Sequence, residues 1–301
     1  MRALVVDHSA PGRLALGAAP DPVLGPDEVL VKVAAISLNY GELPQSEGVA
    51  AGTVPGWDAA GVVERAAANG RGPKPGDSVV TWGRTGGWAE LRAVHVDELA
   101  VLPEAVDFAT AAALPVAGLT AVRALRRAGV LPGQRVAVTG ASGGVGRFAV
   151  QLAHLAGAEV YAFVGSKARG EGLAALGADH VLTKPADLDA PVDVVLDNVG
   201  GPLLAELLDH IAQEGKVISI GATSDEPTPI QPYQLVRSRL TLIGIQAGGG
   251  TAADLAHLVR LVADGRLQAN VDRVADWGRA GETATALVNR EIRGKAVLTL
   301  N

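Results

Sequence analysis

The chain has 301 residues, of which 48% are apolar and 19% charged, enough for a large buried core and for two domains. Its formal net charge is −6 and it has no long run of Lys or Arg, which argues against a nucleic-acid surface. It contains no cysteine, so disulfides, thiolate zinc sites, iron–sulfur clusters and a cysteine nucleophile are excluded.

The N-terminal sequence shows no targeting signal. The apolar stretch Ala3–Val6 is too short for the core of a signal peptide, and Asp7 ends it. No stretch approaches the roughly 20 apolar residues of a membrane helix. We therefore expect a cytoplasmic protein that binds neither membrane nor nucleic acid.

From Met1 to about Pro115 the chain has the pattern of a β-rich unit with little helix. Short apolar runs alternate with turn sequences such as GPDE and GRTGG. The runs are Leu14–Leu16, Val29–Ala34, Gly61–Val63 and Ser78–Trp82.

From about Ala117 strands and helices alternate, which predicts a parallel sheet covered on both faces. The expected strands are Gln134–Thr139, Glu159–Val164, His180–Leu182, Val192–Asp197, Lys216–Ile220 and Leu240–Ile245. The expected helices are Leu119–Ala128, Val145–Ala156, Ala168–Leu176 and Gly201–Ala212.

The C-terminal part begins with a predicted helix, Ala252–Ala263, whose apolar residues form one stripe. Two strands are expected after it, Val271–Val274 and Ala296–Leu300. We expect the last run, GKAVLTL, to return to the sheet of the first unit.

A glycine-rich loop lies between the strand candidate Val136–Thr139 and the helix that begins near Val145. It reads Ala141-Ser142-Gly143-Gly144-Val145-Gly146, with Ala141 in place of the first glycine of the dinucleotide fingerprint. Gly143 lets the backbone approach a pyrophosphate, and the helix N-terminus supplies free N–H groups. We expect a dinucleotide site here; the alternative is a tight turn without ligand.

The segment after the second strand of this unit indicates which dinucleotide binds. An NAD site usually carries an acidic residue there, for the ribose 2′-hydroxyl. This chain has Gly165, Ser166, Lys167 and Arg169 instead, which suits a 2′-phosphate and predicts NADPH. The alternative is that Lys167 and Arg169 are solvated charges at a helix start.

Several linked motifs resemble those of the medium-chain dehydrogenase/reductase superfamily, and within it the zinc-independent quinone oxidoreductase branch. The resemblance covers nearly the whole chain and rests on the order and spacing of the motifs. They are Val29–Val33 with Ser37-Leu38-Asn39, Pro55–Gly61, Gly76–Val79, Gly86–Glu90, Leu114–Ala121, the glycine loop, Leu176–Asp179, Asp197–Gly200 and Gly294–Leu298.

The resemblance implies an α/β architecture in which a Rossmann-type, doubly wound parallel sheet domain is inserted in a mainly β, GroES-like catalytic domain. We expect residues 1–117 and 258–301 to form the catalytic domain and residues 118–257 the NADPH-binding domain. It also implies a homodimer, commonly formed through the sheet edge near Leu240–Ile245.

The resemblance also implies that no metal is bound. The places of the zinc ligands of zinc-dependent relatives read Asn39, Trp57 and roughly Pro115, and none of these is a good zinc ligand. Without a metal to stabilise an alcoholate, the expected acceptor is already activated: a quinone or an α,β-unsaturated carbonyl compound.

Two residues are the candidates for catalysis. Tyr40 is the preferred hydrogen-bond or proton donor, and Asn39 the residue that orients substrate or the nicotinamide ribose. The alternatives are a packed aromatic for Tyr40 and a turn residue for Asn39.

Further residues are expected to line the cofactor by resemblance: Thr120, Asn198, Gly221, the Gly244–Gln246 turn and Lys295. The alternative for Lys295 is a solvated charge on a strand, which is the more typical role of a lysine there.

The chain departs from the family pattern after Asn39, where an aspartate often follows three positions on and an arginine seven on. Here these are Glu42 and Ser46, and the stretch Gly48–Pro55 is compressed. Both changes fall at the expected substrate entrance.

Three functions therefore remain open. The first is an NADPH-dependent reductase of quinones or activated alkenes. The second is a dedicated enoyl thioester reductase of a biosynthetic pathway, and the third a non-catalytic NADPH-binding regulatory protein.

Overall fold

The computed structural model describes residues 1–45 and 48–300, which fold as two units. Unit 1 contains Met1–Leu119 and Gly248–Asn301, and unit 2 contains Thr120–Ala247. The chain passes from unit 1 into unit 2 within one helix, α3 (Pro115–Ala128). Among the described residues, no helix combines the length and the apolar character needed to cross a membrane.

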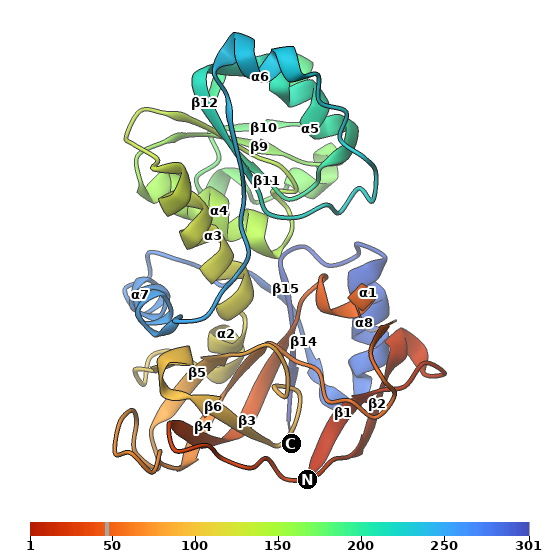
Figure 1. Ribbon diagram of the computed structural model, residues 1–301, viewed down its shortest axis with the longest axis vertical. Helices are drawn as coiled ribbons and strands as arrows, with labels where there is room; N and C mark the ends of the chain where they lie inside the picture. Colours follow the sequence, from red (N-terminus) through yellow and green to blue (C-terminus); the bar gives the residue numbers. More distant parts are fainter. Residues whose placement is uncertain (46–47, 301) are drawn as a thin grey trace. The chain divides into compact units, whose positions relative to one another are not determined.

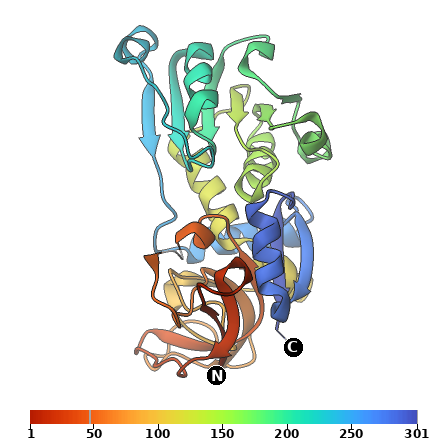
Figure 2. The same ribbon diagram turned by 90° about the vertical axis from the view of Figure 1, so that its right-hand side faces the viewer.

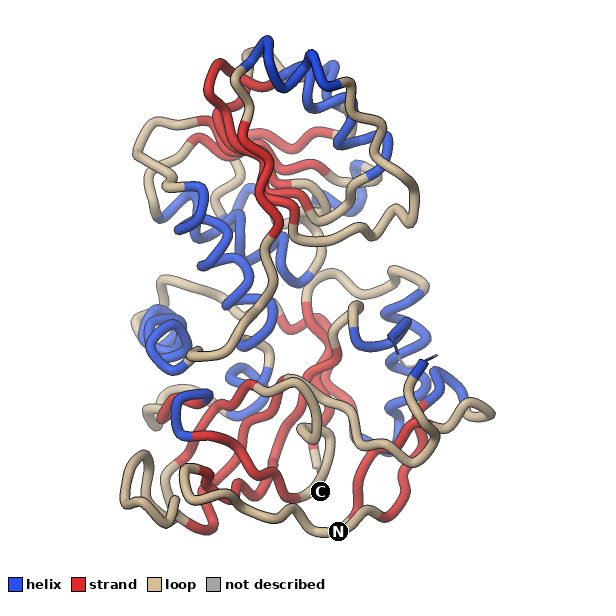
Figure 3. Tube along the Cα trace, viewed as in Figure 1, coloured by secondary structure: helices blue, strands red, loops and turns tan. Residues whose placement is uncertain are grey.

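Unit 2 is built on a six-stranded parallel sheet with the order β10-β9-β8-β11-β12-β13. Helices cover both faces of this sheet (Figures 1 and 3), so it is the doubly wound Rossmann-type domain expected. Its strands are β8 (Arg135–Val138), β9 (Glu159–Phe163), β10 (His180–Leu182), β11 (Val192–Asp197), β12 (Ile211–Ser219) and β13 (Thr241–Gly244). Its helices are α4 (Gly144–Leu155), α5 (Gly201–Leu207) and α6 (Pro232–Ser238).

Two helices predicted for this unit are wrong. The stretch Ala168–Leu176 forms two short 3₁₀ turns, η4 (Lys167–Gly170) and η5 (Ala174–Leu176), because Gly172 between them has φ +79°. The stretch Gly201–Ala212 ends as a helix at Leu207. After the 3₁₀ turn η7 (Leu208–His210), β12 begins at Ile211, earlier than expected.

Unit 1 contains a seven-stranded sheet with the order β14-β15-β3-β4-β5-β7, in which β6 also pairs with β3, and a separate β1–β2 ladder. The strands are β1 (Arg2–Val6), β2 (Leu14–Ala18), β3 (Glu28–Leu38), β4 (Asp58–Arg65), β5 (Ser78–Trp82), β6 (Leu91–His95), β7 (Leu99–Val101), β14 (Val271–Asp276) and β15 (Lys295–Thr299). The helices are α1 (Glu42–Gln45), α2 (Phe108–Ala112), α7 (Ala252–Ala263) and α8 (Ala280–Val288), of which α7 was predicted and the other three were not.

The C-terminal strand β15 lies inside the sheet of unit 1. It pairs antiparallel with β3, from Ala296 opposite Leu38 to Thr299 opposite Ala35, which confirms the expected return of GKAVLTL. Figure 2 shows this C-terminal segment beside the N-terminal strands. Both ends of the chain therefore contribute to one apolar core, which contains Leu4, Trp88, Trp277 and Leu298.

The second boundary between the units lies ten residues before the expected one at 257/258. Helix α7 packs on β7, and the carboxylate of Glu98 accepts hydrogen bonds from the N–H of Gly250 and from the N–H and hydroxyl of Thr251. These contacts join residues 248–257 to unit 1.

Candidate functional site

The glycine loop of unit 2 connects β8 to α4 and has the form of a phosphate cradle. A Cβ on Gly146 would lie 2.3 Å from the carbonyl oxygen of Gly140, so only glycine lets α4 pack this closely on the loop. Gly143 is the N-cap of α4 and provides no side-chain cap. The first N–H groups of the helix, at Gly144 and Val145, therefore remain available to an anion.

A hydrogen bond joins the loop to the basic segment after β9. The Nε of Arg169, in η4, donates to the hydroxyl of Ser142 at 3.0 Å. Arg147, in the first turn of α4, reaches the same loop and donates through Nε to the carbonyl of Ser142 at 3.4 Å. Lys167 is exposed, and a Cβ on Gly165 would meet no atom within 4 Å. Positive charge and open space thus adjoin the cradle.

A second group of expected cofactor residues lies at the ends of β11 and β12. The side chain of Asn198 donates to the carbonyl of Thr139, which directly follows β8, at 2.8 Å. Gly221 follows β12, and a Cβ there would lie 3.1 Å from the carbonyl oxygen of Asn198. Buried Asp197 accepts from the Thr139 hydroxyl and the Gly200 N–H, and burial raises its pKa.

The strand order explains why these residues meet. The chain reverses its winding direction between β8 and β11, and the glycine loop and Asn198 follow these two strands directly. Ligands of open α/β sheets bind at such a switch point, beyond the carboxyl ends of the strands. The residues present there fit the phosphates and ribose of a dinucleotide.

Two expected cofactor residues stand apart from this group. Thr120 is buried within α3, and Gln246 is exposed after β13. In the part of the chain that the structure describes, no hydrogen bond joins either residue to the glycine loop.

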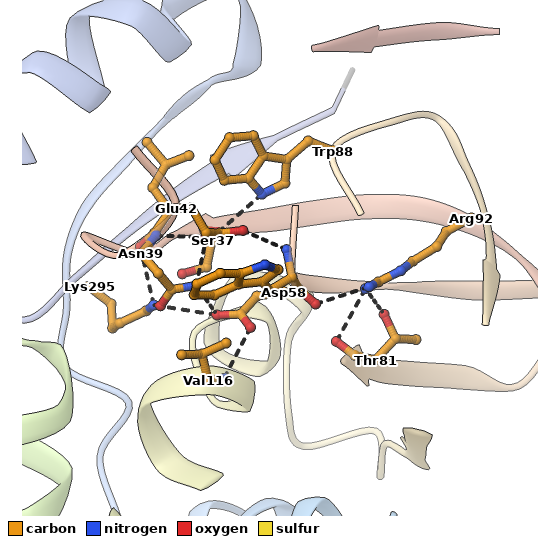
Figure 4. A network of polar contacts seen from close by, with 11 residues as sticks. Ser37, Asn39, Glu42, Asp58, Thr81, Trp88, Arg92, Val116 and Lys295 are labelled. Atoms are coloured by element: carbon orange, nitrogen blue, oxygen red, sulfur yellow. Dashed lines mark hydrogen bonds and ion pairs between the residues drawn. The ribbon is translucent and has the colours of Figure 1, made fainter. Parts of the chain in front are cut away.

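Unit 1 contains a buried polar cluster centred on Asn39 (Figure 4). The Nδ2 of Asn39 donates to Asp58 Oδ2 at 2.8 Å and to Glu42 Oε2 at 2.9 Å. Its Oδ1 accepts from Lys295 Nζ at 2.5 Å. Both amide hydrogens of Asn39 are thus used inside the protein, which leaves only acceptor capacity on Oδ1 for a ligand.

The carboxylates of the cluster fix the ends of other elements. Glu42 also accepts hydrogen bonds from the N–H groups of Asn39, at 3.1 Å, and of Trp57, at 2.7 Å. Asp58 accepts from the N–H of Val116, in the first turn of α3, at 3.0 Å. The cluster therefore ties the end of β3 to the start of β4 and to the start of α3.

Lys295 is not the solvated strand charge that its sequence position suggested. It is 2% exposed, it lies 3.5 Å from Asp58 Oδ2, and it donates to the carbonyl of Leu38 at 3.2 Å. The prediction failed because β15 is an interior strand of the sheet, flanked by β14 and β3. A lysine at its first position is therefore enclosed and needs a buried carboxylate as its partner.

Arg92 is the second buried cation of this region. Its guanidinium donates to the hydroxyl of Thr81 at 2.7 Å and to the carbonyl of Trp57 at 3.0 Å. It is 2% exposed, and its charge helps to balance those of Asp58 and Glu42. Two cations thus face two carboxylates in the interior.

Burial dominates the titration of the cluster. Burial and the negative charge of Asp58 raise the pKa of Glu42 to about 8, against the hydrogen bonds from Asn39 and Trp57 that lower it. Burial also raises the pKa of Asp58, and the charge of Lys295 opposes that rise. Burial lowers the pKa of Lys295, and it lowers the pKa of Arg92 to about 10.

Tyr40 belongs to the turn that follows β3. Its side chain is half-buried, and its hydroxyl has no hydrogen-bond partner within the described ranges 1–45 and 48–300. The hydroxyl is thus available to a ligand. Ser46, the second departure from the family pattern, lies outside the described residues.

Sequence reasoning missed the roles of Asp58, Arg92 and Arg147. Asp58 and Arg92 lie in apolar strands, at the start of DAAGVV and within LRAVH, where an isolated charge indicates a buried partner. Arg147 lies in the first turn of α4, where the helix dipole disfavours a cation and a further contact is expected. In all three cases the signal was an isolated charge where none is favourable.

Two family models match the chain, one within unit 1 and one that covers most of unit 2 and extends to residue 264 of unit 1. The model described as alcohol dehydrogenase GroES-like domain matches residues 25–104, and the model described as zinc-binding dehydrogenase matches residues 144–264. A solved thermostable alcohol dehydrogenase from Pyrobaculum aerophilum is 30% identical, with 99% of each chain covered and a TM-score of 0.87. The chain belongs to the medium-chain dehydrogenase/reductase superfamily.

Relatives whose names give other activities also match the chain. A quinone oxidoreductase from Coxiella burnetii is 26% identical, with 100% of this chain and 99% of that chain covered and a TM-score of 0.88. The 2-methylene-furan-3-one reductase of Solanum lycopersicum is 38% identical over 201 residues, 60% of this chain. The chain spans 51% of that enzyme, and between 8% and 13% of the polyketide synthases that it also matches.

The titration of Glu42 predicts how the stability of the protein depends on pH. With its pKa raised to about 8, Glu42 keeps a proton in the folded chain up to about that pH, whereas a free Glu has a pKa of 4.5. Between these values the folded state binds more protons than the unfolded state, so the free energy of unfolding falls as pH rises. The limiting slope is about 1.4 kcal/mol per pH unit.

Urea unfolding at a series of pH values from 5 to 8 measures this slope, with both units monitored. Glu42→Gln removes the titration, so the difference in slope between wild type and variant is the readout. Glu282→Gln is the control, because the ion pair with Arg279 lowers the pKa of Glu282 and moves its titration below this range. Parallel profiles for wild type and Glu42→Gln would contradict the prediction.

Proposed function

We propose that the chain is an NADPH-dependent, zinc-independent reductase that transfers hydride to a quinone or an α,β-unsaturated carbonyl compound. The observation that carries the proposal is the state of Asn39. This residue stands where zinc-dependent relatives have a metal ligand, yet its side chain is bound to Glu42, Asp58 and Lys295. The chain also has no cysteine to replace it.

The residues of unit 2 support the choice of cofactor. NADPH, when bound, supplies the hydride. The N–H groups of Gly144 and Val145, with Ser142 and Gly143, would hold its pyrophosphate. Lys167 and Arg169 would pair with the 2′-phosphate, with Gly165 and Ser166 leaving room for it. We propose that the remainder of the cofactor is lined by Asn198, Gly221, Thr120 and Gln246.

The residues of unit 1 support the choice of acceptor. The Tyr40 hydroxyl, which has no partner in the described part of the chain, can donate a hydrogen bond to a carbonyl oxygen as negative charge develops there. The same hydroxyl can later supply a proton. Asn39 holds the turn that carries Tyr40, and Lys295 acts through Asn39 and Asp58 rather than as a free cation.

We also propose a homodimer. Strand β13 is the last strand of the parallel sheet, so one of its edges is unpaired in the described chain. Its residue Leu242 is 43% exposed. An unpaired apolar edge is protected when a second copy pairs with it.

The similarity to polyketide synthases favours an alternative substrate of the same chemistry. One of these alignments covers 92% of this chain. An enoyl thioester is an α,β-unsaturated carbonyl compound, so a dedicated enoyl reductase of a biosynthetic pathway would use the same donor groups.

Turnover measurements separate these functions. We expect loss of nicotinamide absorbance when the protein is mixed with NADPH and either 1,4-benzoquinone or simple enones. Much faster turnover of enoyl thioesters would assign the alternative function. Tight NADPH binding without oxidation across the whole panel would contradict both and indicate a non-catalytic binding protein.

Cofactor preference is tested by the double variant Lys167→Ala/Arg169→Ala. Loss of two charge-assisted contacts to the 2′-phosphate should weaken NADPH binding by about 10²-fold or more and leave NADH binding nearly unchanged. Calorimetric titration of both nucleotides measures this. Lys184→Ala is the control, because Lys184 is an exposed lysine of the same unit that pairs with Asp187. Equal losses for NADPH and NADH would refute the assignment of this segment.

A further inference from the structure

Trp57 is held through its main chain by two buried ionisable side chains. Its N–H donates to Glu42 Oε1 at 2.7 Å, and its carbonyl accepts from Arg92 at 3.0 Å and from the N–H of Gly83 at 3.0 Å. Burying a carboxyl group and a guanidinium is costly, and here both groups bind the backbone of one residue. Three hydrogen bonds therefore fix the main chain at Trp57.

The conformation of the preceding residue adds to this constraint. Gly56 has φ +111°, and a Cβ there would lie 2.4 Å from the indole of Trp88. Only glycine allows the chain to pass this close to the core before it reaches Trp57. The direction in which the Trp57 side chain leaves the main chain is therefore fixed by the conformation of Gly56 and by the hydrogen bonds of Trp57 itself.

The indole of Trp57 itself remains outside the core. The chain has four tryptophans, and Trp82, Trp88 and Trp277 are 6%, 1% and 2% exposed, whereas Trp57 is half-buried. Its Nε1–H has no hydrogen-bond partner among the residues that the structure describes. An aromatic ring whose backbone is fixed, but which is partly exposed and whose N–H has no partner, is arranged as a binding surface rather than as core.

The neighbour of this ring is the turn that carries Tyr40. The outer edge of the indole, at Cζ3 and Cη2, lies 3.7 and 3.5 Å from the place that a Cβ would take on Gly41. Because Gly41 has no side chain, it does not fill that space. Tyr40, one residue earlier, is half-buried with an unpartnered hydroxyl. Two aromatic side chains with available donors thus belong to adjoining segments.

We propose that Trp57 is a substrate-binding residue whose indole stacks on a flat, conjugated ring bearing carbonyl oxygens, and that it favours cyclic quinones over small acyclic enones. The electron-rich indole face attracts the electron-poor quinone ring, and Tyr40 donates to a quinone oxygen. This inference rests on the proposed function, since it names the acceptor class of the same reductase.

Kinetics of Trp57 variants test the stacking. Trp57→Ala should raise KM for tetramethyl-1,4-benzoquinone by about 2- to 12-fold, the loss expected for one aromatic stacking contact, with kcat little changed. Trp57→Phe keeps a stacking face and should restore most of the affinity. KM for but-3-en-2-one should change less in both variants. Tyr233→Ala removes a 73% exposed aromatic of unit 2 and is the matched control.

Tryptophan fluorescence gives a readout that needs neither NADPH nor turnover. The other three tryptophans are buried, so bound tetramethyl-1,4-benzoquinone should quench Trp57 in a saturable way. The methyl groups leave no free ring position for covalent addition. Trp57→Phe should show only weak, linear, collisional quenching, while its circular dichroism spectrum and Tm confirm folding.

The outcomes separate this inference from the proposed function. An unchanged quinone KM in Trp57→Ala, or saturable quenching that persists in Trp57→Phe, would overturn the role of Trp57 even if NADPH is oxidised. Saturable quenching that is lost in Trp57→Phe, in a protein that oxidises no NADPH, would support the binding surface and refute the reductase.

Discussion

The buried contact of Lys295 with Asn39 and Asp58 is the interaction on which unit 1 depends. Lys295 begins β15 near the C-terminus, and its partners lie at the end of β3 and the start of β4. An ammonium group and a carboxylate lose several kcal/mol each on leaving water, so either is tolerated here only with the other present. The arrangement therefore fixes the position of the C-terminal strand, not just its pairing.

The geometry of the candidate active site follows from this constraint. With Lys295 on its oxygen, the Asn39 amide must point both hydrogens at Asp58 and Glu42. Glu42 in turn holds the N–H of Trp57. A chain of buried ionisable groups thus positions the turn with Tyr40 and the main chain at Trp57, and these groups are themselves enclosed in the protein. In the proposed function, the half-buried donors contact the substrate and the buried ionisable groups position them.

Local patterns predicted most of the fold. The β8–loop–α4 unit was predictable because strand, glycines and helix each have a local signal. The return of β15 to the sheet of unit 1 was expected from the apolar run at the end of the chain. The helix predicted over Ala168–Leu176 failed because Gly170 and Gly172 outweigh its apolar spacing. The burial of Lys295 could not be predicted from local sequence, since it depends on the pairing of β15 with strands distant in the sequence, such as β3.

The candidate site, like the fold, was predicted from local sequence only in part. Ser142 and Arg169 were both predicted from local sequence, but their hydrogen bond depends on how close η4 lies to the loop. Glu42 was noticed only as a departure from a family pattern, at an expected substrate entrance. The structure places it inside instead, where three backbone and amide donors offset part of the cost of burying its carboxyl group.

A double-mutant cycle on Lys295→Met and Asp58→Asn tests the central claim most directly, with the free energy of unfolding measured by urea denaturation. Each single variant leaves one buried charge without its partner and should cost about 3–5 kcal/mol. The double variant removes both charges and should be clearly more stable than the sum of the two losses predicts. Additive losses would show that the two groups do not stabilise each other, and would contradict the account.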